Sequence, residues 1–235
     1  MESYGKLPLA FIFNQGQMDS TVRFYTQGPG GVFYLTSEGS VSDIIQPMVH
    51  PKKKNPFSQK ELPQNNKVKH LVLKKRFLNM NPDCEIVGEG ELSGKINYLM
   101  DNKSQSQYKT IPTYRQVRYR NLYPGIDLIY YGKMGKLEYR YEIQPSTDTD
   151  NIQKSPASKI KFSLEGARKL KIQTHGNLII YTSLGTISEK KPEASQDNNE
   201  SISIGYRVSK KNIIGFKVDS YDHSKTLFIH SGGLR

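Results

Sequence analysis

The sequence has few of the residues that would reveal its chemistry or its compartment. It contains 235 residues but a single cysteine, Cys84, and no tryptophan. One cysteine excludes a disulfide framework within the chain and a paired-cysteine motif for metal or redox chemistry. Because an exported bacterial protein without disulfides and a cytosolic protein both fit this composition, cysteine usage leaves the compartment open.

Long apolar runs are also missing. No segment approaches the roughly 20 apolar residues of a membrane-spanning helix. The residues from Met1 to Phe11 lack a basic stretch followed by an apolar run, so we expect no signal peptide in this chain. The protein is then either intracellular or a fragment whose export signal lay upstream.

Helical spacing is absent as well, since no stretch of ten or more residues repeats its apolar positions every three to four residues. Short segments alternate instead. From Leu137 to Ile143 every second side chain is apolar or aromatic, the period of two that a half-buried strand produces. Ile126–Tyr131 reads as a more buried strand before it, and Gly132–Gly135 as the hairpin loop between them.

Comparable segments recur along most of the chain. The predicted strands lie at about 9–13, 22–26, 32–36, 41–45, 70–78, 95–100, 117–120, 159–164, 170–172, 177–182, 202–208, 213–218 and 226–230. Such short intervals are typical of a sandwich or an open barrel. We therefore predict an all-β chain, an antiparallel β-sandwich with long polar loops.

The polar segments set the expected domain organisation. Residues 47–68 contain four prolines and a lysine run and predict a mobile insertion. Residues 101–108 are also polar and are expected to be exposed. Residues 144–158 form a second polar connection, and 189–200 form a third, exposed one. We predict a single β-rich domain over 1–235, either one continuous sandwich or two abutting β units that divide near residue 150.

The charge is strongly positive, with 34 Lys and Arg against 22 Asp and Glu and a formal net charge of +12. A basic surface attracts nucleic acid, anionic cell-wall polymers or anionic lipid head groups. The plainer interpretation is that lysine serves here as a solubilising residue, since it is scattered over nearly every predicted strand edge and loop.

Tyrosine and arginine alternate before the central hairpin, and these residues form the candidate ligand-binding set. They could stack sugar rings or bases and hold phosphates. On a strand, however, neighbouring side chains point to opposite sides, so one face would pack and the other would be solvated. The set consists of Tyr114, Arg115, Arg118, Tyr119, Arg120 and Asp127.

Asp127 lies in an otherwise apolar strand. A buried aspartate usually accepts bonds from turn amides or from a basic partner, and Arg118 or Arg120 could be that partner. A glycosidase would need two carboxyl groups across a cleft, which Asp127, Glu138, Glu89 and Glu91 could supply only if the fold brought two of them together. The structural role is the favoured interpretation of Asp127.

No other pattern indicates a reaction, a cofactor or a metal. The five histidines lack ligand spacing, and Asp148-Thr-Asp150 resembles the start of a calcium loop without its glycine and later glutamate. There is no nucleophile elbow and no phosphate-binding loop. We predict a protein that is not an enzyme, with no catalytic residues, no cofactor and no metal site.

Several segments resemble one known family. They are NQGQ at Asn14–Gln17, IPTY at Ile111–Tyr114, NLYPGIDLIYYG at Asn121–Gly132, LEYRYEI at Leu137–Ile143 and IGFKVDSYDHSKTL at Ile214–Leu227. The chain is similar, over nearly its whole length, to a bacterial domain of unknown function. That domain is found N-terminal to SBBP-type β-propeller repeats in extracellular proteins.

The resemblance implies an exported, β-rich, multidomain surface protein, and it carries over no catalytic residues. Two features depart from the family. Arg140 stands where relatives tend to have an acidic residue, and the chain ends at Arg235 without the propeller that would follow. We therefore expect a fragment, a truncated product or a stand-alone version.

Three functional hypotheses remain. The first is a non-catalytic structural or adhesion-type module, extracellular or on the cell surface, whose partner is a cell-surface polymer, a glycan or a β-propeller region of the same or another chain. The second is a carbohydrate-binding module or a polysaccharide-acting enzyme, which requires exposed aromatic residues in a groove. The third is a polyanion or nucleic-acid binder, and it rests on charge alone.

Overall fold

The computed structural model describes residues 9–28, 30–47, 68–102, 105–146, 155–197 and 200–232. Most of the predicted insertion at 47–68 and both Asp148 and Asp150 lie outside these ranges. Strands make up most of the described residues, and their one short helix is the 3-10 helix η2 (Pro156–Lys159). The all-β prediction is therefore confirmed.

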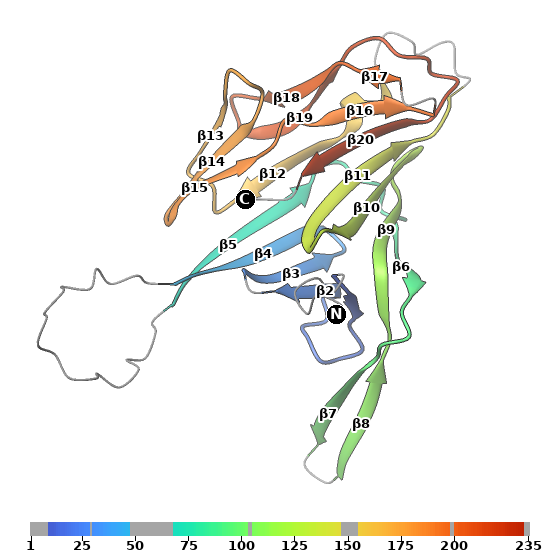
Figure 1. The fold of residues 1–235 in the computed structure, drawn as a ribbon, viewed down its shortest axis with the longest axis vertical. Coiled ribbons are helices and arrows are strands. Elements are labelled where there is room, and N and C mark those ends of the chain that lie inside the picture. Colours follow the sequence, from blue (N-terminus) through green and yellow to red (C-terminus); the bar gives the residue numbers. More distant parts are fainter. Residues whose placement is uncertain are drawn as a thin grey trace, which may run out of the picture.

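Most strands belong to one large antiparallel sheet (Figure 1). It contains 15 strands, and β6 (Glu85–Glu91) branches from it by pairing with β9. The other strands follow in the order β17 (Ser201–Ile202), β16 (Glu193–Gln196), β20 (Leu227–Gly232), β11 (Lys136–Ile143), β10 (Ile126–Lys133), β9 (Thr113–Tyr123), β1 (Phe11–Phe13), β2 (Val22–Gly28), β3 (Gly31–Thr36), β4 (Gly39–Pro47), β5 (Val68–Phe77), β12 (Lys161–Glu165), β19 (Ile213–Val218) and β18 (Ile204–Val208).

The large sheet nearly closes on itself. Its two end strands, β17 and β18, are separated in the chain only by Ser203, so a single extended stretch pairs with β16 at one end and with β19 at the other. The sheet also joins both sides of residue 150, because β5 pairs with β12 and β11 pairs with β20. A nearly closed sheet surrounds its core and leaves few strand edges unpaired.

Two small sheets complete the described structure. One consists of β13 (Lys169–Ile172), β14 (Leu178–Thr182) and β15 (Gly185–Glu189), and the other is the hairpin of β7 (Ile96–Asn102) and β8 (Gln105–Ile111). Figure 1 shows this hairpin projecting from the foot of β9. Of the polar segment 101–108, residues 101–102 and 105–108 belong to the paired strands of this hairpin, because backbone pairing requires no apolar side chains.

The core is a row of aromatic rings inside the large sheet. Tyr119, Tyr130, Tyr139 and Tyr141 are each at most 4% exposed. Successive rings lie 6.1, 5.6 and 5.9 Å apart between centroids, the spacing of tilted and edge-to-face pairs. Because these tyrosines come from the adjacent strands β9, β10 and β11, the period-two pattern of the sequence indeed places them on one face.

The tyrosine hydroxyl groups tie distant strands together. Tyr119 on β9 donates to the carbonyl oxygens of Thr36 and Gly39, each at 2.9 Å, in the turn between β3 and β4. Tyr123, also on β9, donates to the carbonyl oxygen of Lys161 on β12 at 2.8 Å. The rings therefore fill the core while their hydroxyl groups bond backbone that would otherwise lose hydrogen bonds to water.

Strand β9 is where the sheet divides. It pairs with β10 along Gln116–Tyr123, with β1 at Thr113 and Tyr114, and with β6 along Tyr114–Arg120. The sheet thus continues from β9 both into β10–β11 and into β1–β2–β3. The residues of these two arms face a common interior space, which forms the cavity described below.

Candidate functional site

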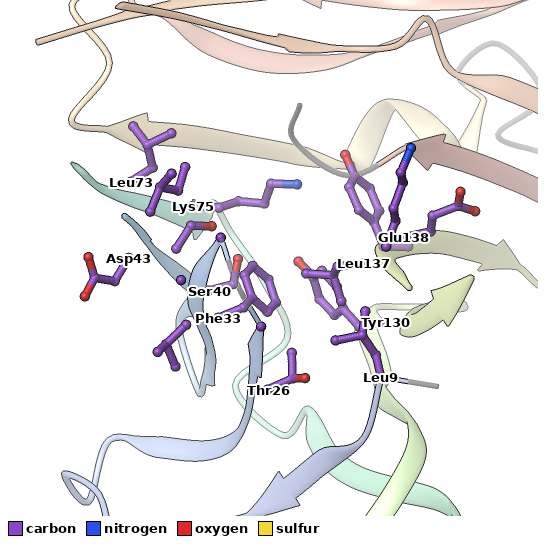
Figure 2. Close-up of a pocket in the computed structure, with 18 of the residues that line it drawn as sticks. Leu9, Thr26, Phe33, Ser40, Asp43, Leu73, Lys75, Tyr130, Leu137 and Glu138 are labelled. Carbon is purple, nitrogen blue, oxygen red and sulfur yellow. The ribbon is translucent and has the colours of Figure 1, made fainter. Parts of the chain in front are cut away.

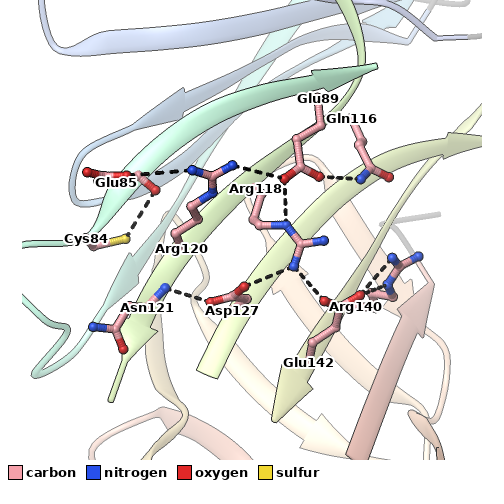
Figure 3. A network of polar contacts seen from close by, with 10 residues as sticks. All are labelled: Cys84, Glu85, Glu89, Gln116, Arg118, Arg120, Asn121, Asp127, Arg140 and Glu142. Atoms are coloured by element: carbon pink, nitrogen blue, oxygen red, sulfur yellow. Dashed lines mark hydrogen bonds and ion pairs between the residues drawn. The ribbon is translucent and has the colours of Figure 1, made fainter. Parts of the chain in front are cut away.

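The outer face of the central hairpin carries a network of charged side chains centred on Arg118 (Figure 3). Arg118 Nε donates to Glu89 on β6 at 2.9 Å, and its Nη1 donates to Asp127 on β10 at 3.0 Å and to Glu142 on β11 at 2.6 Å. The Arg118 side chain is 17% exposed. One guanidinium group therefore links three carboxylates across four neighbouring strands.

Asp127 has the structural contacts that the sequence predicts. Its Oδ2 accepts from Arg118, and its Oδ1 accepts from the backbone N–H of Asn121 at 2.7 Å. Asn121 has φ of 53°, a left-handed conformation that an asparagine tolerates in a turn. Asp127 thus fixes the β9–β10 turn and neutralises part of the charge of Arg118.

Other polar residues extend the network at its edges. Gln116 donates to Glu89 at 2.7 Å, and Arg140 donates to Glu142 at 2.8 Å. Arg120 is more exposed and lies 3.7 Å from Glu89. Burial opposes the charged form of Arg118, but hydrogen bonds to its three carboxylates outweigh this effect and raise its pKa well above the ordinary value.

The structure separates the candidate ligand-binding residues onto two faces. Arg118 and Arg120 lie on the outer face, whereas Tyr119 is fully buried on the inner one. Tyr114 is half-buried beneath Gly88, where a Cβ atom would come within 2.5 Å of its ring. Arg115 is exposed and packs its stem along Gly90. The six residues therefore do not converge on one site.

The aromatic side chains of this region offer no stacking platform for a sugar. Tyr119, Tyr130 and Tyr139 are buried, and Tyr114 makes an edge contact with Phe24 at 5.8 Å between centroids. Carbohydrate and base recognition by stacking requires an exposed ring face. The carbohydrate-binding hypothesis gains no support from these four tyrosines.

A cavity of about 520 Å³ opens between the two arms of the sheet (Figure 2). Its walls come from β2, β3, β4 and β5 on one side and from β10, β11, β12 and β15 on the other. Phe33, Leu73, Leu137, Leu164 and Ile187 make much of its lining apolar. A volume of this size is in the range of small-molecule sites in proteins.

Buried polar atoms without a partner are concentrated at this cavity. Among the described residues, four buried side-chain polar atoms make no hydrogen bond, and three of them belong to cavity residues: Thr26 Oγ1, Tyr130 OH and Glu189 Oε2. These three residues are at most 3% exposed. The Ser40 hydroxyl is near enough to Tyr130 to affect its pKa, yet the two groups do not form a hydrogen bond of good geometry.

Lys75 extends from β5 into the same space, toward β11 (Figure 2). Its Nζ lies 3.9 Å from the centroid of the Tyr139 ring and 4.5 Å from that of Phe162. Within the described residues its ammonium group has these ring faces but no hydrogen-bond acceptor. Desolvation lowers the pKa of Lys75, and the nearby Glu189 carboxylate opposes this effect. Lys75 is partly exposed, in agreement with its position in the cavity lining.

Glu189, at the end of β15, faces Lys75 across the interior. Its Oε1 accepts hydrogen bonds from the Tyr139 hydroxyl and, at 2.7 Å, from Ser231 Oγ, which also contacts the Tyr206 hydroxyl at 2.6 Å. Glu189 is buried, whereas the sequence predicted an exposed connection over 189–200. The tertiary structure places the end of β15 against β11 and β20, and the polar partners there compensate the buried carboxylate.

The sequence analysis did not single out Lys75, Glu189 or Thr26. The signal for Lys75 was present, since it shares its strand face with Leu71 and Leu73, which are both buried. A lysine on the apolar face of a strand indicates either a strand end or a functional group. Glu189 offered no such signal, because the residues after it are polar.

The described residues contain no cluster of three or more His, Cys, Asp or Glu side chains arranged to hold a metal ion. Among these residues there is also no helix long and apolar enough to cross a bilayer. Cys84 is a free, half-buried thiol, and burial is the main reason that its pKa is raised to about 11.

Comparison with known proteins gives a family match. Neither the search of curated proteins nor the search of solved structures found a match. The matching family model is that of a domain of unknown function (DUF7948), and it covers residues 11–230, from β1 to β20. The chain therefore belongs to the DUF7948 family.

Proposed function

We propose that this chain is a non-catalytic structural or adhesion-type module of an exported bacterial multidomain protein. The observation that carries the proposal is the Arg118 network. The charged residues that most resemble a site in sequence contact one another across β6, β9, β10 and β11 and so hold the strands together. Side chains committed in this way stabilise a sheet and have little capacity left for a substrate.

The extracellular location and the association with SBBP-type propeller repeats are parts of the same proposal. They rest on the resemblance of segments such as Asn121–Gly132 and Leu137–Ile143 to that family. A module of this kind would present the large sheet as a rigid unit beside a propeller. Protease accessibility on intact cells that express the full-length protein tests this location, because an internal protein would be protected until the cells are lysed.

Binding of the purified chain to neutral glycans, cell-wall polymers and nucleic acids at physiological salt tests the role itself. A structural module binds none of them, and an adhesion-type module binds one cell-wall polymer through a surface outside the Arg118 network. Turnover of any of these polymers would contradict the proposal. Salt-resistant binding of a neutral glycan that the Arg118→Met variant loses would contradict it too, because the network would then contact ligand.

A second candidate, polyanion binding, is favoured by a basic row on the outer face of β12, β19 and β18. Lys161 and Arg207 both pair with Gly215, and Lys217 follows two residues later on the same face. All three basic side chains are exposed, and none forms an ion pair within the described part of the chain.

The salt dependence of binding to a nucleic acid distinguishes this candidate. The logarithm of the binding constant should fall linearly with the logarithm of salt concentration, at about one unit of slope per phosphate neutralised. Changing Lys161, Arg207 and Lys217 together to serine should reduce the slope by about 2–3. The exposed Lys133, Lys136 and Lys169, changed in the same way, form the matched control. An equal effect of both triple variants would mean that net charge alone attracts the polymer.

A further inference from the structure

The cavity between the two arms of the sheet has the chemistry of a ligand site. A buried polar group without a hydrogen bond costs about 1–3 kcal/mol, and a folded protein has few of them. Three such atoms belong to residues that line this one cavity, Thr26, Tyr130 and Glu189. They come from β2, β10 and β15, three strands of different parts of the chain, so a local distortion of one strand does not explain them. A bound molecule would supply the missing partners.

The charges of the cavity define the polar group of that molecule. Lys75 provides donors without an acceptor, and Glu189 Oε2 provides an acceptor without a donor. The other charged side chains of the lining are exposed or already have a partner, and they are Asp43, Lys136, Glu138 and Lys190. An anionic ligand would be repelled by Glu189, and a cationic ligand by Lys75. A single hydroxyl group can accept from the ammonium group and donate to the carboxylate at the same time. Thr26 and Tyr130 add hydroxyl groups that can donate or accept.

The walls of the cavity define the remainder of the molecule. Phe33 and Tyr130 form an aromatic pair with centroids 5.3 Å apart, and Leu73, Leu137 and Leu164 add aliphatic surface. An apolar or aromatic body fits such walls, because burial of its surface is favourable and needs no hydrogen bonds.

We propose that this cavity binds a neutral, largely apolar alcohol or phenol, with its hydroxyl group directed at Lys75 and Glu189. The ligand lies inside the nearly closed sheet and contacts both arms that diverge from β9. This site is separate from the Arg118 network on the outer face, and the inference does not depend on the proposed structural or adhesion-type role.

Three probes with the same apolar body test the polar group. They are para-butylphenol, para-butylanisole and para-butylbenzoate, titrated into the full chain and followed by calorimetry and by protein-detected NMR. The anisole lacks the donor, and the benzoate adds a negative charge. We expect para-butylphenol to bind at least about tenfold more tightly than the other two, because hydrogen bonds to charged groups contribute about 1.5–3 kcal/mol.

Two conservative variants remove unpartnered hydroxyl groups without changing side-chain shape. Tyr130→Phe should weaken para-butylphenol binding about threefold to tenfold, because a ligand hydroxyl that donates to Glu189 has two lone pairs and can accept from Tyr130 as well as from Lys75. Thr26→Val is the comparison and should change binding by at most about twofold, because the phenol has no second polar group for Thr26. Their unfolding midpoints should stay the same or rise, because neither hydroxyl makes a hydrogen bond within the described structure. A hydroxyl with a purely structural role would give the reverse result, with lower stability and unchanged affinity.

A blocking variant tests the location. Ser42 lines the cavity on β4, and Ser42→Phe should abolish binding of the phenol. Ser201→Phe, at an exposed strand position on β17, is the matched control and should bind as the native chain does. If Ser42→Phe fails to fold, the two conservative variants still decide the location.

The outcomes separate cleanly. Selective binding of the phenol, weakened by Tyr130→Phe and unaffected by Ser201→Phe, supports the proposal. Equal binding of phenol and anisole, or preferred binding of the benzoate, overturns the inferred polar group. No binding of any probe up to its solubility limit overturns the cavity as a ligand site.

Discussion

The hydroxyl group of Tyr139 on β11 donates a hydrogen bond to the carboxylate of Glu189 on β15, 50 positions later in the chain. This contact connects the small sheet β13–β14–β15 to the aromatic core of the large one. It also orients Glu189, so that Oε1 is bonded by Tyr139 and Ser231 while Oε2 is left without a partner beside the cavity. Replacing one member should therefore affect more than its own packing.

A double-mutant cycle measures this contact. Tyr139→Phe should lower the free energy of unfolding by about 2–3 kcal/mol, because a buried carboxylate loses one of its two donors. The stability loss of the double variant Tyr139→Phe/Glu189→Gln should differ from the sum of the two single losses by about 1 kcal/mol or more, because the residues belong to one hydrogen-bond network. Tyr181→Phe, at an exposed position, is the control and should change stability by at most about 0.5 kcal/mol. Strict additivity in chemical denaturation would contradict the coupling.

Removal of Arg118 should destabilise the large sheet. Arg118→Met keeps the aliphatic stem but leaves Glu89, Asp127 and Glu142 as three partly buried carboxylates without their shared cation. We expect a loss of about 2–4 kcal/mol, since breaking a buried ion pair leaves uncompensated charge. Arg120→Met is the matched control, and it should cost at most about 1 kcal/mol because that side chain is 52% exposed and its ion pairs are long. Equal effects of the two variants in urea unfolding would refute the central role of Arg118.

Stability should fall at alkaline pH because of the buried tyrosines. Desolvation raises the pKa of Tyr123 to about 12, and it raises the pKa values of Tyr119, Tyr130, Tyr139, Tyr141 and Tyr206 above their usual range. In the unfolded chain these groups ionise near pH 10. Above that pH the native state holds more protons than the unfolded state, so the stability that is complete below about pH 10 is lost as the pH rises.

Urea unfolding at about pH 9 and about pH 11.5 checks this expectation. Lys75 has the opposite effect below its unfolded pKa of 10.5, because desolvation lowers its folded pKa, but this one lysine offsets only part of the fall that the six tyrosines cause. Tyrosinate absorbance should appear together with unfolding. In the Tyr130→Phe variant the free energy of unfolding should fall less steeply with pH, because about one proton fewer is released on unfolding. A urea midpoint that stays constant over this pH range would contradict the burial of the tyrosines.

Gly31 should not tolerate a side chain. Its φ is +131°, and a Cβ atom there would lie 1.9 Å from the carbonyl oxygen of Asp43 on the neighbouring strand β4. Gly31→Ala should therefore cost about 2–4 kcal/mol in thermal or urea unfolding. The adjacent Gly30 has open space where a methyl group would be added, so Gly30→Ala is the matched control and should change stability by at most about 0.5 kcal/mol. Similar costs at both positions would refute the close approach of β3 and β4.

The central hairpin shows how far the sequence alone leads. Strict alternation predicted the strand at Leu137–Ile143, and an apolar segment predicted a more buried strand at Ile126–Tyr131; the structure confirms them as parts of β11 and β10. Alternation also placed Tyr119 and Arg118 on opposite faces. Arg118 or Arg120 was expected to be the partner of Asp127, and in the structure it is Arg118. These predictions succeeded because they depend on neighbours in one strand or in adjacent strands of a hairpin.

A polar segment shows what the sequence alone does not predict. Residues 189–200 were expected to be an exposed connection, yet this segment begins with the buried Glu189. Composition indicates how readily a segment can be solvated. It does not say which polar side chain meets a compensating partner, because that partner comes from a strand many residues away.

The sequence by itself determined the all-β class, the strands of the central hairpin and the side of each strand that faces the core, because the period of two is a local property of an extended backbone. Only the tertiary structure decided that the sheet nearly closes, that it divides at β9, and that Thr26, Lys75, Tyr130 and Glu189 line one cavity. Those relationships join strands up to more than a hundred residues apart in the chain, and pairing over such distances depends on the packing of the whole sheet rather than on any local pattern.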